Sequence, residues 1–524
     1  MTPTNTYSHT QSRRRFLQQS TATLAALTLT PSHLFAATET PGHPTILATP
    51  SGKLRGEIKD SLRIFRGIPF AQPPIGPLRF RPPLPIKPWS GIRNATTFAP
   101  AAPQPDDPGV THSEDCLYLN VWAPTGPGPF PVFVWIHGGG YTNGRSFDPL
   151  FDGARFARNG IVFVSVAYRL GALGFLDLEP LLGPTYADSA NNATRDLTLA
   201  LQWVHHNIAA FAGDPTRVTV GGESAGAKAT AALMAIPAAA SLFQSAISES
   251  GGGERINTLA QAAEVAHQYG QLWRTQHPSA SPNFHDLLTA SPADLLHAQT
   301  ALIATSDRHF PFRAEVGSTF LPQRPVDLVA AGSFQHKRLL IGTNRDENAL
   351  FLGPHPPADP TSSNLGNLDL DTFNHVFAKY KSLYPDMTDS QRRIRAVSAE
   401  EYWVPSVRLA EAQTQAHGPT WMYRLDYAKP SGPMAGQAYH SLDLSLVWQT
   451  PDPIEAADPT AAPLALQMHQ AWVNFILGND PTAPTLPPWP TYNLETRATM
   501  ILADQPHIED NPNQPELQLW NSTL

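Results

Sequence analysis

The stretch RVTVGGESAGAKATAAL, residues 217–233, joins an apolar run of strand-forming residues to a run of helix-forming residues. Ser224 stands at the joint, with Gly222 and Gly226 two positions away on either side. A sharp strand-to-helix turn strains the backbone of its central residue, and side chains at the two flanking positions would collide unless they were hydrogen atoms. The G-x-S-x-G pattern therefore predicts an exposed nucleophilic serine at the start of a helix whose first N–H groups face the substrate. A Gly-rich turn without chemistry is the alternative that the rest of the chain must exclude.

Segments on both sides of this turn alternate between strand and helix patterns. Two continuous apolar runs, FPVFVWIHGGG at 130–140 and GIVFVSVAYRL at 160–170, fit strands buried on both faces of a mostly parallel sheet. Further patterns indicate short strands from about residue 45 and helices over 193–215, 254–310 and 370–425. This alternation predicts an α/β fold with a large central sheet flanked by helices.

The composition is that of a globular chain. The 524 residues are 41% hydrophobic and 15% charged, which is compatible with one large domain or with two. The formal net charge of −8 argues against the basic surface that nucleic-acid binding requires. No apolar run approaches the roughly 20 residues that a membrane-spanning helix needs. The expected partner is a small uncharged molecule, and the sequence indicates no oligomeric state.

The N-terminus has the layout of an export signal. The segment SRRRFLQQSTATLAALTLTPSHLFAATET begins with cationic residues, continues with a mildly apolar stretch and ends with small residues near Ala36 and Ala37. Arg13 and Arg14, followed by Phe16, resemble the twin-arginine motif. We expect a signal peptide at 1–37, a mature chain at 38–524, and a bacterial protein delivered to the periplasm or secreted. A disordered basic tail is the alternative.

Two further strand ends offer partners for the serine, which needs a base and an acid that orients the base. HGGGY at 137–141 ends one apolar run, and its glycines let backbone N–H groups approach a carbonyl oxygen closely. IGTNRDEN at 341–348 ends another strand and brings Asp346 and Glu347 to the rim of the sheet, where ligand sites lie. The residue pattern alone does not choose between these two acids or among the 19 histidines.

The chain resembles the type-B carboxylesterases, the α/β-hydrolase family that includes para-nitrobenzyl esterases and cholinesterases. The resemblance spans roughly residues 45–520. It rests on the ordered motifs RGIPFAQPPIGPLRF, SEDCLYLNVW, WIHGGGY, VSVAYRLGALGF, GESAG, SESG, GTNRDE, AYHSLDLSLVW, AWVNFILGNDP and WPTYN. It implies an α/β-hydrolase fold with N-terminal antiparallel strands and helical insertions.

The resemblance also implies the roles of individual residues. Ser224 is the expected nucleophile, Glu347 the acid and His440 the base, in the chain order that this fold uses. The expected oxyanion hole consists of the backbone N–H groups of Gly139, Gly140 and Ala225. Supporting roles beside the catalytic residues are expected for Glu223, Ser250 and Tyr141. With His440 as the base, activity should fall on acidification, because an imidazolium cannot accept a proton.

The sequence departs from the family pattern at several positions. Ala102 stands where relatives have a cysteine that pairs with the cysteine of the EDCL motif, so Cys116 is expected to be an unpaired and buried thiol. The long disulfide loop of cholinesterases, with its cation-binding tryptophan, is missing between Gln104 and Ser113, which disfavours quaternary ammonium substrates. His205 and His206 are adjacent on a helix and point in different directions, so no metal site is expected.

These observations predict a serine hydrolase that cleaves small to medium, uncharged carboxylic esters through an acyl-enzyme and needs no cofactor. Amide or peptide hydrolysis is the rival within the fold, but the added propeller or cap of the prolyl peptidases is missing. A non-catalytic binding module is the rival from another class, and it is disfavoured because all three triad positions are retained. Family members with a triple glycine like 138–140 are associated with esters of bulky tertiary alcohols, so such substrates are expected here.

Overall fold

The structure of the chain is a computed structural model that describes residues 42–105 and 107–522. The expected signal peptide at 1–37 lies outside these residues. Within the described ranges, no helix combines the length and the apolar character needed to cross a membrane.

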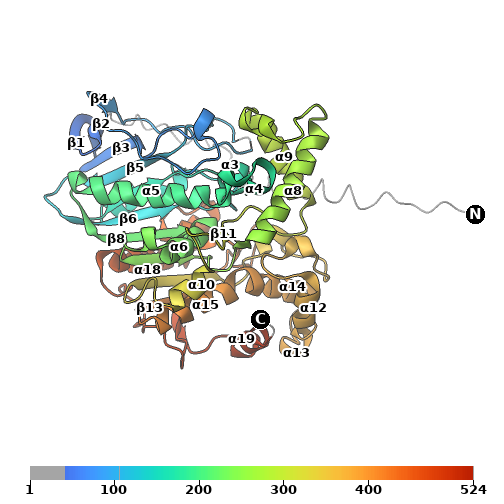
Figure 1. Ribbon diagram of the computed structural model, residues 1–524. Coiled ribbons are helices and arrows are strands. Elements are labelled where there is room, and N and C mark those ends of the chain that lie inside the picture. The colour runs from blue at the N-terminus through green and yellow to red at the C-terminus, as the bar shows by residue number, and fades with distance from the viewer. Residues whose placement is uncertain (1–41, 106, 523–524) are drawn as a thin grey trace, which may run out of the picture.

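One large sheet dominates the architecture (Figure 1). It contains thirteen strands, and a separate pair, β10 (Asn257–Thr258) and β11 (Glu315–Val316), forms a second small sheet. The strands of the large sheet are β1 His43–Thr49, β2 Gly52–Lys59, β3 Leu62–Pro69, β4 Ile92–Asn94, β5 Tyr118–Pro124, β6 Phe130–Ile136, β7 Val162–Val166, β8 Gly213–Glu223, β9 Ser245–Glu249, β12 Arg338–Asn344, β13 Thr420–Leu425, β14 Thr499–Leu502 and β15 His507–Glu509.

The order of the strands is β1-β2-β3-β5-β7-β6-β8-β9-β12-β13-β14-β15, with β4 beside β2. Neighbouring strands from β7 to β14 are parallel, as is the pair β2–β4. The other pairs, β1–β2, β2–β3, β3–β5, β5–β7 and β14–β15, are antiparallel. The expected mostly parallel sheet with antiparallel N-terminal strands is therefore confirmed.

The position of β6 inside the sheet explains why its sequence does not alternate between apolar and polar residues. Val132, Val134 and Ile136 enter the hydrophobic core on one face of the sheet, and Phe133 and Trp135 enter the core on the other face. Because successive side chains of a strand point to opposite faces, a strand covered on both sides must be apolar at every position.

Helices cover both faces of the sheet. On one face lie α5 (Asn192–Asn207) and α6 (Ala225–Ala235), which face the viewer in Figure 1, together with α10 (Pro325–Ala330) and α15 (Val404–Gln415). The other face is covered by α2 Ala154–Ala157, α16 Leu442–Val447 and α18 Ala461–Leu477. The sheet is thus the middle layer of three.

The remaining helices form insertions and short connections. The pair α8 (Leu259–Gln276) and α9 (Pro292–Thr305) lies beside the sheet, in the region where the sequence predicts helices (Figure 1). The other helices are α3 Gly171–Phe175, α4 Glu179–Leu182, α7 Pro237–Ala240, α11 Ala349–Leu352, α12 Leu370–Phe377, α13 Tyr380–Leu383, α14 Asp389–Ser398, α17 Pro453–Ala457 and α19 Gln514–Asn521. Between α14 and α15 the chain forms one π-helical turn, Ala399–Trp403.

Cys116 lies in the core on the α5 side of the sheet. Its side chain is fully buried, and Ala102 belongs to the same core cluster. Burial raises the pKa of the Cys116 thiol, so the thiolate is disfavoured.

Candidate active site

Ser224 occupies a strained turn between β8 and α6. Its φ is 56° and its ψ is −120°, outside the regions that L-residues ordinarily adopt, and its N–H donates to the Glu249 carbonyl at 2.9 Å. A Cβ on Gly226 would lie 2.0 Å from the Ile136 carbonyl oxygen, so no other residue fits that position. The strand, the turn and the helix that the G-x-S-x-G pattern predicts are all present.

Glu347 and His440 meet beside this turn. Glu347 follows β12 and His440 precedes α16, and 93 residues separate them in the chain. His440 Nδ1 lies 2.5 Å from Glu347 Oε2, while the other oxygen, Oε1, accepts from the Asn344 N–H at 2.7 Å. Glu347 is fully buried and His440 is nearly so. Asp346 does not contact His440, because its side chain bonds instead to Arg345 and to the backbone of Ala438.

Burial shifts the pKa values of both partners. It raises the pKa of Glu347 to about 7, against the lowering influence of the Ser250 hydroxyl and of the Asn344 N–H. It lowers the pKa of His440 to about 4, with Glu223 acting in the opposite direction and the cations Lys228 and Arg255 adding to the decrease. The imidazole is therefore neutral over the ordinary pH range, as a general base must be.

Glu223 faces the nitrogen of His440 that Glu347 leaves free. Its Oε1 lies 3.2 Å from His440 Nε2 and accepts a hydrogen bond from Ser441 Oγ at 2.6 Å. Ser224 Oγ makes no hydrogen bond with any residue that the structure describes, whereas Glu223, the residue before it, contacts His440. Catalytic hydrogen bonds often form only when substrate is bound.

The segment HGGGY folds into a loop with unusual backbone angles. The φ angles of Gly139, Gly140 and Tyr141 are 106°, 61° and 65°. The Gly139 carbonyl accepts from Thr142 N–H at 3.0 Å and from Asn143 N–H at 2.9 Å, and so it is turned into the loop. In the described part of the chain, the N–H groups of Gly139 and Gly140 have no hydrogen-bond acceptor. Ala225 begins α6, where N–H groups also lack partners within the helix.

Tyr141 and Ser250 make contacts between neighbouring segments of the chain. The Tyr141 ring is buried against Phe175, with 4.3 Å between the ring centroids, and its carbonyl accepts from the Gly171 N–H at 2.7 Å. Ser250 has a φ of 54° and its N–H donates to the Gly342 carbonyl at 2.8 Å. Tyr141 thus links the Gly-rich loop to α3, and Ser250 links the end of β9 to β12.

Aromatic side chains surround the imidazole, and the sequence motifs do not predict them. The ring centroid of His440 lies 4.7 Å from that of Tyr402 and 5.2 Å from that of Phe351. Phe310 lies 5.7 Å from Phe351 and covers Gly140, because a Cβ on that glycine would be 2.6 Å from the Phe310 ring. Tyr402 comes from the π-helical turn, a conformation often found at functional sites.

A buried ionic cluster lies behind Tyr402 and is also missed by the motifs. Lys228 Nζ lies 3.4 Å from Glu401 Oε1 and 4.2 Å from the centre of the Tyr402 ring, and Arg255 pairs with the same carboxylate. Lys228 stands one helical turn after Ser224. A lysine within the small apolar run AGAKATAAL is the one sequence signal that could have indicated such a cluster.

The described residues contain no group of three or more His, Cys, Asp or Glu side chains placed to hold a metal ion. The site combines a strained serine, a neutral imidazole oriented by a buried carboxylate, and backbone N–H groups without acceptors. These are the groups that nucleophilic attack on a carbonyl carbon requires.

Comparisons with known proteins cover nearly the whole described chain. Residues 43–520 match the model of a family described as the carboxylesterase family. The para-nitrobenzyl esterase of Bacillus subtilis (strain 168) is 36% identical over 490 residues, which is 90% of this chain and 98% of that protein. The phenmedipham hydrolase of Pseudarthrobacter oxydans is 31% identical over 494 residues, covering 88% and 95% of the two chains.

Solved structures give the same result. A para-nitrobenzyl esterase superimposes with a TM-score of 0.79 at 35% identity, over 91% of this chain and 99% of the other. The Geobacillus stearothermophilus carboxylesterase EST55 at pH 6.2 also gives a TM-score of 0.79, at 30% identity over 91% and 100% of the two chains.

Proposed function

This chain belongs to the carboxylesterase family and is a serine-dependent carboxylic ester hydrolase, and we propose that Ser224, His440 and Glu347 are its catalytic residues. In this proposal Ser224 is the nucleophile, His440 the general base and Glu347 the acid that orients the imidazole. The single observation that carries it is the 2.5 Å contact between Glu347 and His440 beside a serine with strained backbone angles.

The reaction proceeds in two halves. Ser224 Oγ attacks the ester carbonyl while His440 Nε2 takes its proton, and Glu347 stabilises the imidazolium that forms. The N–H groups of Gly139, Gly140 and Ala225 receive the oxyanion of the tetrahedral intermediate. His440 then returns the proton to the departing alcohol, which leaves an acyl-enzyme. Water repeats the sequence, so that the acid is released and Ser224 Oγ regains its proton.

Glu223 occupies the place where the Ser224 proton must arrive. Its contact with Nε2 is 3.2 Å long, and Ser441 holds the same carboxyl oxygen. Formation of the Ser224–His440 hydrogen bond on substrate binding therefore requires Nε2 to exchange Glu223 for Ser224. We assign Glu223 a positioning role, and Tyr141 and Ser250 the support of the oxyanion loop and of the acid.

The preferred substrates in this proposal are small to medium, uncharged esters. Phe310, Phe351 and Tyr402 give the surroundings of His440 an apolar character, which favours neutral over charged groups. Amide hydrolysis remains the second candidate activity within the fold. Comparing the rates of hydrolysis of the para-nitrobenzyl ester and the para-nitroanilide of one acid would distinguish the esterase from the amidase activity.

We further propose that residues 1–37 are a twin-arginine signal peptide and that the mature chain, 38–524, acts in the periplasm or outside the cell. The paired Arg13 and Arg14 before a mildly apolar stretch support this location.

Replacement of Ser224 by Ala tests the catalytic assignment. The purified variant should keep the melting temperature of the parent and lose turnover of a para-nitrophenyl ester by at least about 10³-fold. A fluorophosphonate should label the parent once, at Ser224, as located by mass spectrometry of the peptides. Turnover of the Ala variant within about tenfold of the parent, or a label on another serine, would contradict the assignment.

A further inference from the structure

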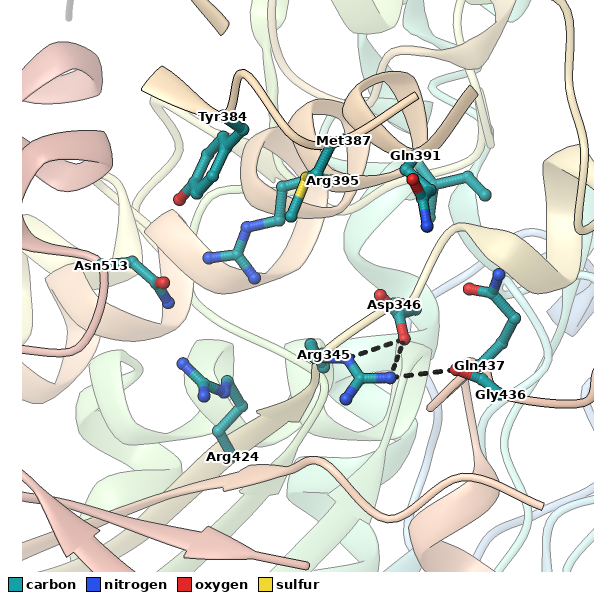
Figure 2. A pocket seen from close by; sticks show the side chains of 11 residues that line it. Arg345, Asp346, Tyr384, Met387, Gln391, Arg395, Arg424, Gly436, Gln437 and Asn513 are labelled. Carbon is teal, nitrogen blue, oxygen red and sulfur yellow. Dashed lines mark hydrogen bonds and ion pairs between the residues drawn. The ribbon is translucent and has the colours of Figure 1, made fainter. Parts of the chain in front are cut away.

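A cavity of about 250 Å³, which Ser224 does not line, lies at the carboxyl ends of β12 and β13 (Figure 2). Helix α14 and the start of α19 close it on the other side. The carboxyl ends of parallel strands are where α/β sheets commonly bind ligands. Its lining residues are Arg345, Asp346, Tyr384, Met387, Gln391, Ile394, Arg395, Arg424, Gly436, Gln437 and Asn513.

Three guanidinium groups line this cavity, and each holds a carboxylate through the same edge. Their Nε and Nη2 atoms engage the partner acids in the pairs Arg345–Asp346, Arg395–Glu516 and Arg424–Asp426. Among these acids only Asp346 lines the cavity. The lining side chains therefore include three cations and one anion, while Asp426, Glu516 and also Glu509, 3.5 Å from Arg424 Nη2, pair with the arginines from outside the lining.

Two of the three Nη1 atoms, those of Arg345 and Arg395, are left with little to bind. Arg345 Nη1 has one long hydrogen bond, 3.3 Å, to the Asp426 carbonyl, and Arg395 Nη1 has none with the described residues. Arg395 lines the cavity and is more than nine-tenths buried, so this donor is largely removed from bulk solvent.

One oxygen atom already lies between two of these groups. With the Asn513 amide turned so that its oxygen faces the arginines, that oxygen is 2.8 Å from Arg395 Nη2 and 2.8 Å from Arg424 Nη1. The arginines are thus spaced to share a single oxygen acceptor, which is the geometry that guanidinium groups offer to carboxylate and phosphate.

We propose that this cavity binds a small oxyanion, a carboxylate or inorganic phosphate, through Arg345, Arg395 and Arg424. The volume is below that of pockets for drug-sized molecules and suits an anion of a few heavy atoms. A carboxylate is also a product of ester hydrolysis, so the enzyme itself supplies one of the two candidate ligands.

The cavity adjoins both loops that carry the proposed acid and base. The Asp346 N–H donates to the Ala438 carbonyl at 2.9 Å, and Asp346 Oδ2 accepts from the Ala438 N–H at 3.0 Å. Asp346 precedes Glu347, and Ala438 precedes His440 by two residues. An anion bound to Arg345 would therefore compete with Asp346 for this guanidinium and alter the hydrogen bonds between Asp346 and Ala438 that join the two loops.

Isothermal titration of the full-length protein with sodium phosphate and, separately, with sodium acetate at low ionic strength tests the proposal. We expect saturable binding of at least one anion with one site per chain, weakened by added sodium chloride. The acetate and phosphate arms distinguish a product carboxylate from phosphate as the source of the ligand.

Gln437 provides the decisive variant, because its side chain lines the cavity and forms no hydrogen bond with the described residues. Gln437→Glu adds a negative charge of nearly the same shape and should weaken binding by about tenfold or more. Gln437→Met and, at an exposed distant position, Gln335→Glu should bind like the parent. Absence of saturable binding of both anions to the parent, or equal affinity of the parent and a Gln437→Glu variant with unchanged melting temperature, would overturn the proposal.

Discussion

His440 Nε2 lies 3.2 Å from Glu223 Oε1, on the ring nitrogen that must accept the Ser224 proton. An imidazole that donates Nδ1–H to Glu347 and is neutral carries no proton on Nε2. The contact with Glu223 is therefore favourable only when a proton lies between the two groups. Burial raises the pKa of Glu223 to about 7 and lowers the pKa of His440 to about 4, which assigns this proton to the carboxyl.

This relationship predicts how activity depends on pH. Glu223 and Glu347, with pKa values raised to about 7, are protonated below that pH and ionised above it. A protonated Glu223 occupies Nε2, and a protonated Glu347 cannot stabilise the imidazolium, so kcat/KM should fall as the pH drops through about 7. The apparent pKa belongs to the coupled group and not to one residue. Formation of the imidazolium, the cause expected from sequence, would act only near pH 4.

The measurement is kcat/KM for a neutral ester between pH 5 and pH 9, with the acid product quantified by chromatography. The melting temperature at each pH serves as a control for folding. A rate that stays constant down to pH 5 would contradict the role of the two carboxyl groups.

Replacement of Gly139 by Val should abolish activity on all esters. The φ of 106° disfavours any side chain, and a Cβ at this position would lie 2.2 Å from the Asn143 carbonyl oxygen, so the loop must move. Loss of one oxyanion donor reduces the rate by about 10² to 10³. The parent should cleave tert-butyl acetate measurably but more slowly than a primary acetate, and Gly139→Val should lose both activities.

Gly91→Val provides the control, because Gly91 also has a positive φ but has open space around it. If the parent cleaves primary esters rapidly and tert-butyl acetate not at all, the Phe310 ring beside Gly140 fills the space that the triple glycine was expected to leave.

Cys116 should be inert in the folded protein. Its side chain is fully buried, so a reagent cannot reach it, and burial raises its pKa, so the reactive thiolate does not form. A maleimide should therefore label the protein in guanidinium chloride but not in buffer, and a reductant should leave the melting temperature unchanged. Complete labelling of the native protein within minutes would show that the thiol is accessible.

Export should depend on the arginine pair itself. Replacement of both Arg13 and Arg14 by Lys keeps the charge, yet a receptor that reads the twin-arginine motif should reject the precursor. We expect esterase activity to move from the periplasmic fraction to the cytoplasm, with total activity preserved. Equal periplasmic activity in the parent and in the double variant would exclude this export route.

Sequence patterns predicted the features that depend on local geometry. The serine turn, the Gly-rich loop and the doubly buried strands follow from glycine spacing and from apolar runs, because these requirements lie within a few residues. The pairing of Glu347 with His440 spans 93 residues and was accessible only through the family resemblance.

Features created by packing between distant elements could not be predicted. Tyr402 reaches His440 because the helix carrying it widens into a π-helical turn, and no residue pattern signals that turn. Lys228 and Arg255 share Glu401 across three different segments. The contact between Glu223 and His440 likewise depends on how the segment before α16 approaches β8.

The arrangement of the site on β8, on β12 and on the segment after β13 makes activity a measure of how completely the chain has refolded. The contact between Glu347 and His440 can form only after strand pairings distant in sequence are in place, and such pairings form more slowly than helices. After dilution from denaturant, hydrolysis of a chromogenic ester should therefore reappear later than the helical circular dichroism signal. A rate assay on a crude preparation accordingly counts molecules with completed topology, whereas staining for protein counts every chain.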